Sequence, residues 1–176
     1  AIPEIINFED CLLNDNDLQF ESLPFNHPLF IMYSSGTTGK PKCIIHGAGG
    51  TLIQHLKEHR LHTNIKKNDR VFFFTTCGWM MWNWLVSALA SEATIVLYEG
   101  SPFFPDPNHL WKIAEEEKIN IFGVSPRYLS SLMKEKHEPR KHNDLSSIKT
   151  ILSTGSPLLV DHFEYIEKSI KDNTQI

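Results

Sequence analysis

The sequence predicts an α/β fold, a mainly parallel sheet flanked by helices. Short apolar runs alternate with helical stretches along the chain. Strand, helix and strand in repetition produce a parallel sheet with helices over its faces. The composition, with 41% hydrophobic and 22% charged residues in a chain of 176, is ordinary for a globular domain with its own core.

The chain opens with residues 1–28, which are rich in Asn, Asp, Pro and Glu and are expected to form a lead-in arm. A domain is expected over residues 29–176. Its predicted strands are residues 29–33, 42–46, 71–76, 94–98, 120–124 and 149–153. Its predicted helices are residues 50–62, 80–90, 107–118, 126–136 and 157–171.

Three of these helices have a marked beginning. A capping residue precedes a proline at Asp106-Pro107, Ser125-Pro126 and Ser156-Pro157. The first side chain can accept a hydrogen bond from the first turn, and proline suits the first helical position. Because such a cap stabilises a helix by about 1 kcal/mol, helices are expected to begin at these three sites.

The segment 33–42, Tyr-Ser-Ser-Gly-Thr-Thr-Gly-Lys-Pro-Lys, has the chemistry of a phosphate cradle. Its glycines let the backbone curl so that several N–H groups face one anion, and its hydroxyls and lysines add donors and charge. No acidic residue occurs between Glu21 and Glu58. The candidate phosphate-binding residues are Ser34, Ser35, Gly36, Thr37, Thr38, Gly39 and Lys40.

Two other interpretations of this segment stay open. A Gly/Ser/Thr run between apolar runs is often a solvated loop. A Walker phosphate loop needs a glycine where Ser34 stands and a helix after the lysine, whereas here Pro41 and a strand follow. The loop is therefore expected to join two strands, with no helix N-terminus behind it.

A ligand crevice is expected beyond the carboxyl ends of the strands, as in open α/β sheets. The segments expected to line it are residues 34–41, 76–79, 99–102, 125–126 and 154–157, which are rich in Gly, Ser, Thr or Pro. Gly78 breaks the strand before it, so Trp79, Met80 and Met81 are expected at the mouth of the crevice as an apolar wall. Trp82 and Trp84 are expected in the core.

Three histidines, His55, His59 and His62, share one face of the predicted helix 50–62. Two such histidines can bind zinc, but no carboxylate or cysteine joins them at ligand spacing. An exposed helix face is the expected environment. The motif Gly-x-Ser-x-Gly is absent and no cysteine has a nucleophile signature, so activation by a nucleotide is expected in place of a side-chain nucleophile.

The net charge of −4 gives no reason to propose a nucleic acid partner. Three cysteines far apart in the sequence form no disulfide framework and no zinc spacing, which favours a reducing compartment, the cytosol. No apolar run approaches the roughly 20 residues of a membrane span.

The chain lacks an initiator methionine and ends on a helix-like run, so a piece of a longer protein is expected. No feature indicates an oligomeric state.

The loop resembles that of the adenylate-forming superfamily, which comprises acyl-CoA synthetases, luciferases and peptide-synthetase adenylation domains. Residues 33–42 match its signature Tyr-(Ser/Thr)-Ser-Gly-(Ser/Thr)-Thr-Gly-x-Pro-Lys at every specified position. Within the superfamily the chain is most similar to the acetoacetyl-CoA synthetase family over about residues 27–157. The motifs that carry this likeness are residues 27–28, 46–50, 75–82, 98–102, 123–126 and 153–157. Cys43 stands where many relatives have glycine, and Ser156 stands where acetyl-CoA synthetases have glutamate. The departure at Ser156 leaves the adenine contact open.

The resemblance implies that residues 29–176 are part of an AMP-binding adenylation domain without its C-terminal lid domain. It implies ATP, Mg²⁺ and CoA as ligands, with acetoacetate or a similar short-chain carboxylate as the substrate. By this resemblance, Ser34–Lys40 bind phosphate, Lys40 stabilises charge, and Mg²⁺ binds near Ser34. Adenine is implied to lie beside Gly155, Ser156 and Pro157. The implied acyl pocket consists of Trp79, Met80, Met81 and Thr154, and the implied CoA path runs by Ser125 and Pro126.

The implied reaction has two steps, formation of an acyl-adenylate with release of pyrophosphate and displacement of AMP by the CoA thiol. In the family, the principal catalytic lysine lies beyond the point that corresponds to Ile176, so the isolated chain is expected to be inactive. Two alternatives remain, a synthetase for another short-chain acid and a non-catalytic module that binds a nucleotide or a partner.

Overall fold

The computed structural model describes residues 9, 12, 19–34 and 39–176. In chain order its main elements are β1 (Pro28–Tyr33), β2 (Cys43–Gly47), α1 (Ala48–Lys57), β3 (Arg70–Phe73), α2 (Met80–Ser87), β4 (Thr94–Val96), α3 (His109–Glu116), β5 (Ile121–Val124), α4 (Pro126–Lys134), β6 (Thr150–Ser153) and α5 (Val160–Tyr165). Short π-helical turns, Glu58–His62 and Ile166–Ile170, continue α1 and α5, and 3₁₀ turns cover Ala88–Ser91 and Pro139–Lys141. The α/β prediction is confirmed.

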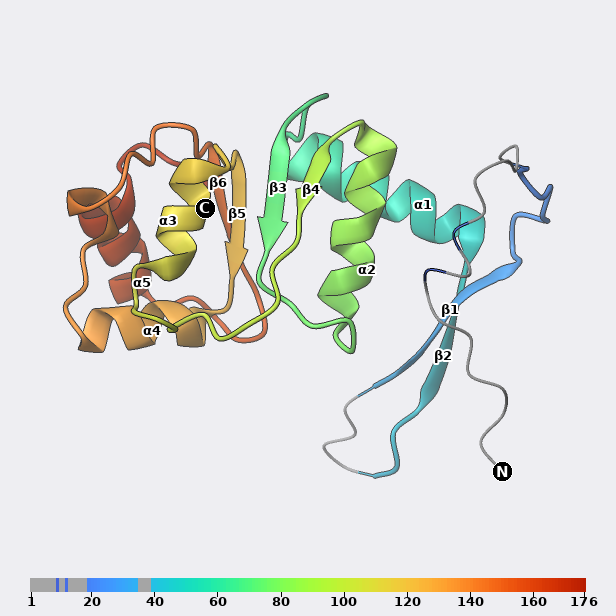
Figure 1. The fold of residues 1–176 in the computed structure, drawn as a ribbon. Helices are drawn as coiled ribbons and strands as arrows, with labels where there is room; N and C mark the ends of the chain where they lie inside the picture. Colours follow the sequence, from blue (N-terminus) through green and yellow to red (C-terminus); the bar gives the residue numbers. More distant parts are fainter. Residues whose placement is uncertain (1–8, 10–11, 13–18, 35–38) are drawn as a thin grey trace.

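Four strands form a parallel sheet in the order β4-β3-β5-β6. In Figure 1, α3, α4 and α5 lie on one side of the molecule, and α1 and α2 on the other. Because β3, β4, β5 and β6 run in the same direction, their carboxyl ends lie at one edge of the sheet, where the crevice was expected.

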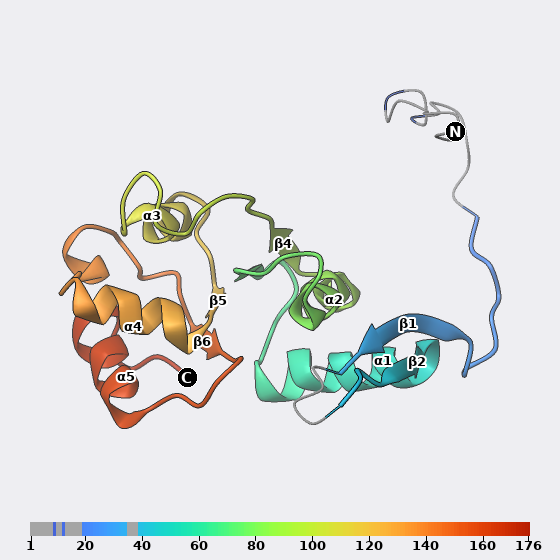
Figure 2. The ribbon, with the colours of Figure 1, turned by 90° about the horizontal axis from the view of Figure 1, so that it is seen from below.

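The strands β1 and β2 form a separate antiparallel hairpin and do not join the parallel sheet. Tyr33 pairs with Cys43, so only residues 34–42 connect the two strands. A parallel crossover needs a dozen or more residues, which this connection lacks. The prediction that the loop joins two strands is confirmed. The expectation that these two strands belong to the parallel sheet was wrong, because β1 and β2 pair only with each other and lie beside α1 (Figure 2).

Alternate residues of the central strands supply two cores. Phe72 and Phe122 point to the side of α3, α4 and α5, where their rings stack at a centroid distance of 5.2 Å. Val71, Phe73 and Ile121 point to the side of α2. This alternation follows from the two-residue period of a strand, and burial on both faces explains why these strands are apolar throughout.

One of the three predicted helix starts is confirmed. The Ser125 Oγ accepts a hydrogen bond from the Tyr128 N–H at 3.3 Å, and Pro126 opens α4. Asp106 instead accepts from the Asn108 N–H at 2.7 Å in a turn, and α3 begins only at His109. The prediction at Ser156-Pro157 was also wrong, because α5 begins at Val160, where the Leu159 N–H donates to His162 Nδ1 at 3.1 Å.

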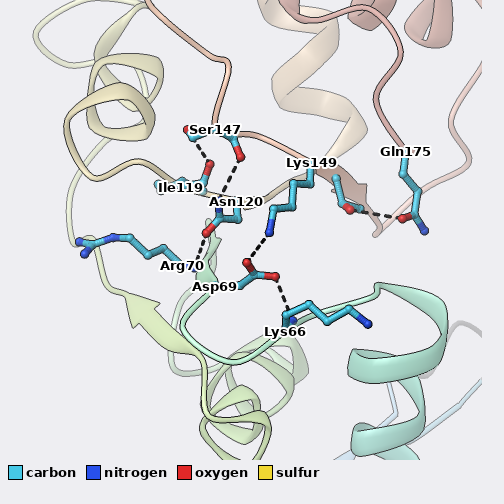
Figure 3. A network of polar contacts seen from close by, with 9 residues as sticks. Lys66, Asp69, Arg70, Ile119, Asn120, Ser147, Lys149 and Gln175 are labelled. Atoms are coloured by element: carbon cyan, nitrogen blue, oxygen red, sulfur yellow. Dashed lines mark hydrogen bonds and ion pairs between the residues drawn. The ribbon is translucent and has the colours of Figure 1, made fainter.

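A polar network ties the strands together at their amino ends, away from the crevice (Figure 3). The buried carboxylate of Asp69 accepts from the Lys66 N–H at 2.9 Å and from Lys149 Nζ at 2.6 Å. Asn120 Oδ1 accepts from the Arg70 N–H at 2.8 Å, and its Nδ2 donates to the Ser147 carbonyl at 3.1 Å. These contacts cross from the loop before β3 to the segments before β5 and β6, so they hold the register of the sheet.

Candidate functional site

Two adjoining cavities form the candidate site, between the hairpin and α1 on one side and α2 and the end of β6 on the other. The larger has a volume of about 720 Å³ and the smaller about 210 Å³. They adjoin because His46, Thr51, His55 and Met80 line both. The larger also reaches Met81, Trp84 and Thr154, and the smaller reaches Met32, Tyr33 and Ser34.

Several predicted site residues are therefore brought together. Met80, Met81 and Thr154 line the larger cavity, as expected of one acyl pocket. Trp79 lies beside Gly155, since a Cβ on Gly155 would be 3.7 Å from Trp79 Cζ2. Gly155 has a φ of +103°, in the region that favours glycine, so both the conformation and the neighbouring ring favour a residue without a side chain. The expected acyl wall and the expected adenine turn are thus neighbours.

The predicted crevice is not one space. Thr76 and Cys77 together with Glu99 and Gly100 line a separate cavity of about 460 Å³, along with Trp82. Ser125 and Pro126, expected on the CoA path, line neither this cavity nor the two that reach Met80. The prediction of a single crevice from all five segments was wrong, because Phe73 and α2 separate the space over β4 from the space over β6.

The loop between β1 and β2 is described at its two ends, and Ser35, Gly36, Thr37 and Thr38 lie outside the described residues. The Ser34 N–H donates to the Lys42 carbonyl at 3.0 Å, and the Lys42 N–H donates to Ser34 Oγ at 3.1 Å. These two bonds close the base of the loop. Gly39 and Lys40 are exposed, and a Cβ at Gly39 would meet no atom of the described residues within 4 Å.

These end residues suit a polyphosphate and its Mg²⁺. The Ser34 oxygen accepts one hydrogen bond and retains a lone pair for a hard cation, which prefers oxygen ligands. Lys40 can reach an anion from solvent without losing an ion pair, because no salt bridge involves it among the described residues. The open backbone at Gly39 leaves room for close approach of an anion.

The predicted environments of the tryptophans are confirmed in part. Trp84 is buried, 7% exposed, and belongs to the core against α2, which confirms the prediction. Trp82 is half-buried and lines the separate 460 Å³ cavity, so its assignment to the core was only partly right. Trp79 is half-buried at the carboxyl side of β3, with its ring edge-on to Phe73 at 5.8 Å. Met80 is 42% exposed and Met81 only 8%.

The expected exposed face of histidines is confirmed for His62 but was wrong for His59 and His55, which are buried and half-buried. His59 is completely buried, and its Nε2 donates to the Trp84 carbonyl at 3.0 Å while its ring lies edge-on to that of Trp84. Burial lowers its pKa to about 4, and the Trp84 carbonyl partly opposes that shift. Leu52 of α1 is 46% exposed. The reason is that α1 and the turn after it face α2 with His55 and His59.

His55 is a site residue that the sequence did not reveal. It lines both cavities, and its Nδ1 lies 2.8 Å from Ser87 Oγ on α2. Burial lowers its pKa, as does nearby His46, whereas Glu58 raises it. The neutral ring therefore predominates at pH 7. The i, i+4 spacing of His55 and His59 was visible in the sequence, but the partner helix α2 was not.

Among the helices that the structure describes, none combines the length and the hydrophobicity of a membrane span.

Comparison with known proteins gives a consistent result. A model of the family "AMP-binding enzyme" matches residues 6–175. The chain is 52% identical to an acetoacetyl-CoA synthetase of Gallus gallus over 98% of its length and 26% of the relative, and 54% identical to an acetoacetyl-coenzyme A synthetase of Rhizobium meliloti over 90% of its length and 24% of the relative. It is 50% identical to malonamoyl-CoA synthetase vrtB of Penicillium aethiopicum, over 85% of its length and 22% of that relative.

The solved structure of an acetoacetyl-CoA synthetase from Streptomyces lividans superposes with a TM-score of 0.86 at 44% identity, over 92% of this chain and 25% of that one. The chain thus spans about a quarter of the length of these relatives. The predicted similarity to acetoacetyl-CoA synthetases is confirmed. The match over almost all of the sequence shows that the chain belongs to the AMP-binding enzyme family.

Proposed function

We propose that this chain is part of an ATP-dependent acid–thiol ligase that converts acetoacetate, ATP and CoA into acetoacetyl-CoA, AMP and pyrophosphate. One observation carries the proposal. The two cavities share Met80 and His55 in their linings, and between them they reach Ser34, at the start of the glycine-rich loop, and Met81 and Thr154. A nucleotide phosphate and a short acid could therefore meet at Met80. The similarity to acetoacetyl-CoA synthetases supports the choice of acid.

In this proposal the loop residues Ser34, Ser35, Gly36, Thr37, Thr38, Gly39 and Lys40 hold the β- and γ-phosphates of ATP. Backbone N–H groups and hydroxyls donate to the phosphate oxygens, and Lys40 stabilises the charge that moves onto pyrophosphate as it departs. Ser34 is the proposed Mg²⁺ ligand in this chain. When bound, Mg²⁺ supplies Lewis-acid stabilisation of the phosphate charge.

Of the remaining proposed contact residues, Met80, Met81 and Thr154 line the larger cavity and the others lie outside its lining. Gly155, Ser156 and Pro157 pass beside the adenine, and Trp79, Met80, Met81 and Thr154 enclose the acyl chain. Ser125 and Pro126 at the start of α4 lie toward the path of CoA. Gly155 is the best supported of these residues, because its backbone conformation and the adjacent Trp79 ring both favour glycine.

The reaction proceeds through an acyl-adenylate. A carboxylate oxygen of the acid attacks the α-phosphorus of ATP, and the bond to pyrophosphate breaks. The CoA sulfur then attacks the acyl carbonyl carbon, AMP leaves, and the thiol proton is released. The residues of this chain contribute binding, orientation and charge stabilisation to both steps.

The acid is proposed to carry a carbonyl at its third carbon. Acetoacetyl and malonamoyl groups, which appear in the names of the relatives, share that carbonyl and differ in the group beyond it.

A cytosolic location is proposed from the cysteine pattern. The rival function is that of a ligase for acetate or propionate. The isolated 176 residues are proposed to be inactive, since the relatives are about four times longer.

The test is to measure kcat/KM of the full-length protein with acetate, propionate and acetoacetate. The proposal predicts the highest value with acetoacetate, because specificity is expressed in this ratio. A higher value with acetate or propionate would favour the rival ligase. Binding of ATP without thioester formation from any of the three acids would favour a non-catalytic module.

A further inference from the structure

His55 lies at the junction of the two cavities. It lines the larger one with Met81 and Thr154 and the smaller one with Ser34. An acid that reaches from the phosphate loop toward the acyl wall would pass this junction, which His46, Thr51 and Met80 also line. Among these four described residues, only the His55 side chain is held by a hydrogen bond to another side chain, so it is the polar group with a fixed orientation there.

The ring of His55 is oriented by a chain of hydrogen bonds on α2. Nδ1 lies 2.8 Å from Ser87 Oγ, and Ser87 Oγ in turn lies 2.8 Å from the Asn83 carbonyl oxygen. With Nδ1 held in this way, Nε2 is the nitrogen that remains for the cavities. The described residues include no hydrogen-bond partner for Nε2. A positioned and accessible polar atom without a protein partner is typical of a ligand contact.

The Ser87 hydroxyl decides whether Nε2 donates or accepts. When Ser87 donates to the Asn83 carbonyl, His55 carries its proton on Nδ1 and Nε2 accepts. When Ser87 turns its proton toward Nδ1, the neutral ring carries its proton on Nε2, which then donates. In the structure Ser87 donates to the Asn83 carbonyl, so rotation of its hydroxyl exchanges that bond for one to Nδ1 and gives the cavity a neutral donor without adding a charge.

We propose that His55 is the residue that selects acids with a carbonyl at the third carbon, through a hydrogen bond from its Nε2–H to that oxygen. The inference rests on the proposed function and deepens it. A ketone oxygen only accepts hydrogen bonds, so it needs such a donor. Gln54, another polar residue of the larger cavity, already donates its amide to Glu58 at 2.9 Å. An alkyl acid of equal length leaves Nε2 unpaired, and a site built to bind a polar group rejects such an analogue.

The experiment compares acetoacetate with butyrate, which has the same number of carbons and no ketone, as substrates of the full-length protein. His55→Leu is expected to lower the kcat/KM for acetoacetate at least tenfold and to leave that for butyrate unchanged or higher. His55→Gln, whose side-chain amide can donate, is expected to retain part of the preference. The control His62→Leu, at an exposed position on the turn that continues α1, is expected to keep the wild-type ratio.

Two results would overturn the inference. One is an unchanged ratio of the two kcat/KM values in His55→Leu. The other is an equal loss with both acids in His55→Leu and His55→Gln, which would mean that the ring only supports the packing of α1 on α2. A wild-type protein that adenylates neither acid would instead refute the proposed function itself, and the inference with it.

Discussion

The ring of Phe73 lies directly over Gly123 on the neighbouring strand. A Cβ at position 123 would be 2.1 Å from Phe73 Cδ2, well inside van der Waals contact. Phe73 is 3% exposed and borders both the 720 Å³ and the 460 Å³ cavities. The absence of a side chain at one residue of β5 therefore sets the position of a ring that separates two cavities.

Gly123→Ala is accordingly expected to destabilise the protein by about 1–3 kcal/mol, the usual cost of overpacking a core. Urea unfolding would measure the change. The matched control is Gly50→Ala in α1, where a new Cβ would meet none of the described atoms within 4 Å. Alanine favours a helix, so the control is expected to be neutral or more stable by up to about 1 kcal/mol. Equal stability of Gly123→Ala and the wild type would show that Phe73 can move at no cost.

The network at the amino ends of the strands gives a second prediction. Asp69→Asn places an amide NH₂ group where the carboxylate accepts hydrogen bonds from Lys66 and Lys149. Because Asp69 is 4% exposed, water cannot replace those bonds, and a loss of about 1–3 kcal/mol in unfolding free energy is expected.

The control for Asp69 is Glu92→Gln. Glu92 also pairs with a lysine at 2.6 Å, Lys67, but both side chains are more than 60% exposed. Exposed pairs contribute only about 0–1 kcal/mol, so this variant is expected to change stability little. If both variants lost the same free energy, burial of Asp69 would not be the cause of its contribution.

The buried His59 predicts a loss of stability in acid. Its pKa in the folded protein is about 4, below the usual value of 6.5, because burial disfavours the charged ring. Between these two values the unfolded chain binds a proton that the folded chain does not. Stability is therefore complete above about pH 6.5 and falls as the pH drops toward 4, by at most about 3 kcal/mol.

Urea unfolding at pH 7, 5.5 and 4.5 would measure this dependence. In His59→Gln, whose amide can still donate to the Trp84 carbonyl, the fall in unfolding free energy is expected to be smaller. His62→Gln, at an exposed position, is expected to follow the wild type. An identical pH dependence in His59→Gln would assign the acid sensitivity to other groups.

Ser125 and His59 show which structural features the sequence allowed us to predict and which it did not. The cap at Ser125 depends on neighbours three residues away, and the sequence was sufficient for it. The strands were likewise found from local apolar runs. The burial of His59 depends on Trp84, 25 residues later, and no local pattern contains that contact. The start of α5 was missed for a different reason, because the His162 ring replaces the expected cap.

The same difference between local patterns and long-range contacts applies to the candidate site. The sequence predicted Met80, Met81 and Thr154 as one wall, and they line one cavity. It did not predict that β1 and β2 form a hairpin apart from the parallel sheet, nor that α1 places His55 between Ser34 and Met81. The first arrangement comes from the pairing of β1 with β2 and the second from the packing of α1 on α2, and both depend on contacts between elements.

The most direct test is to measure acetoacetate-dependent exchange of labelled pyrophosphate into ATP by the full-length protein. It shows whether the loop between β1 and β2 holds the phosphates. Exchange is expected in the wild type and is expected to fall about 10- to 100-fold in Lys40→Ala, because a group that stabilises the transferred charge is lost. Lys67→Ala, which removes an exposed lysine 67% accessible to solvent, is expected to exchange at the wild-type rate. Exchange that depends on acetoacetate but is unaffected by Lys40→Ala would contradict the assignment of the loop.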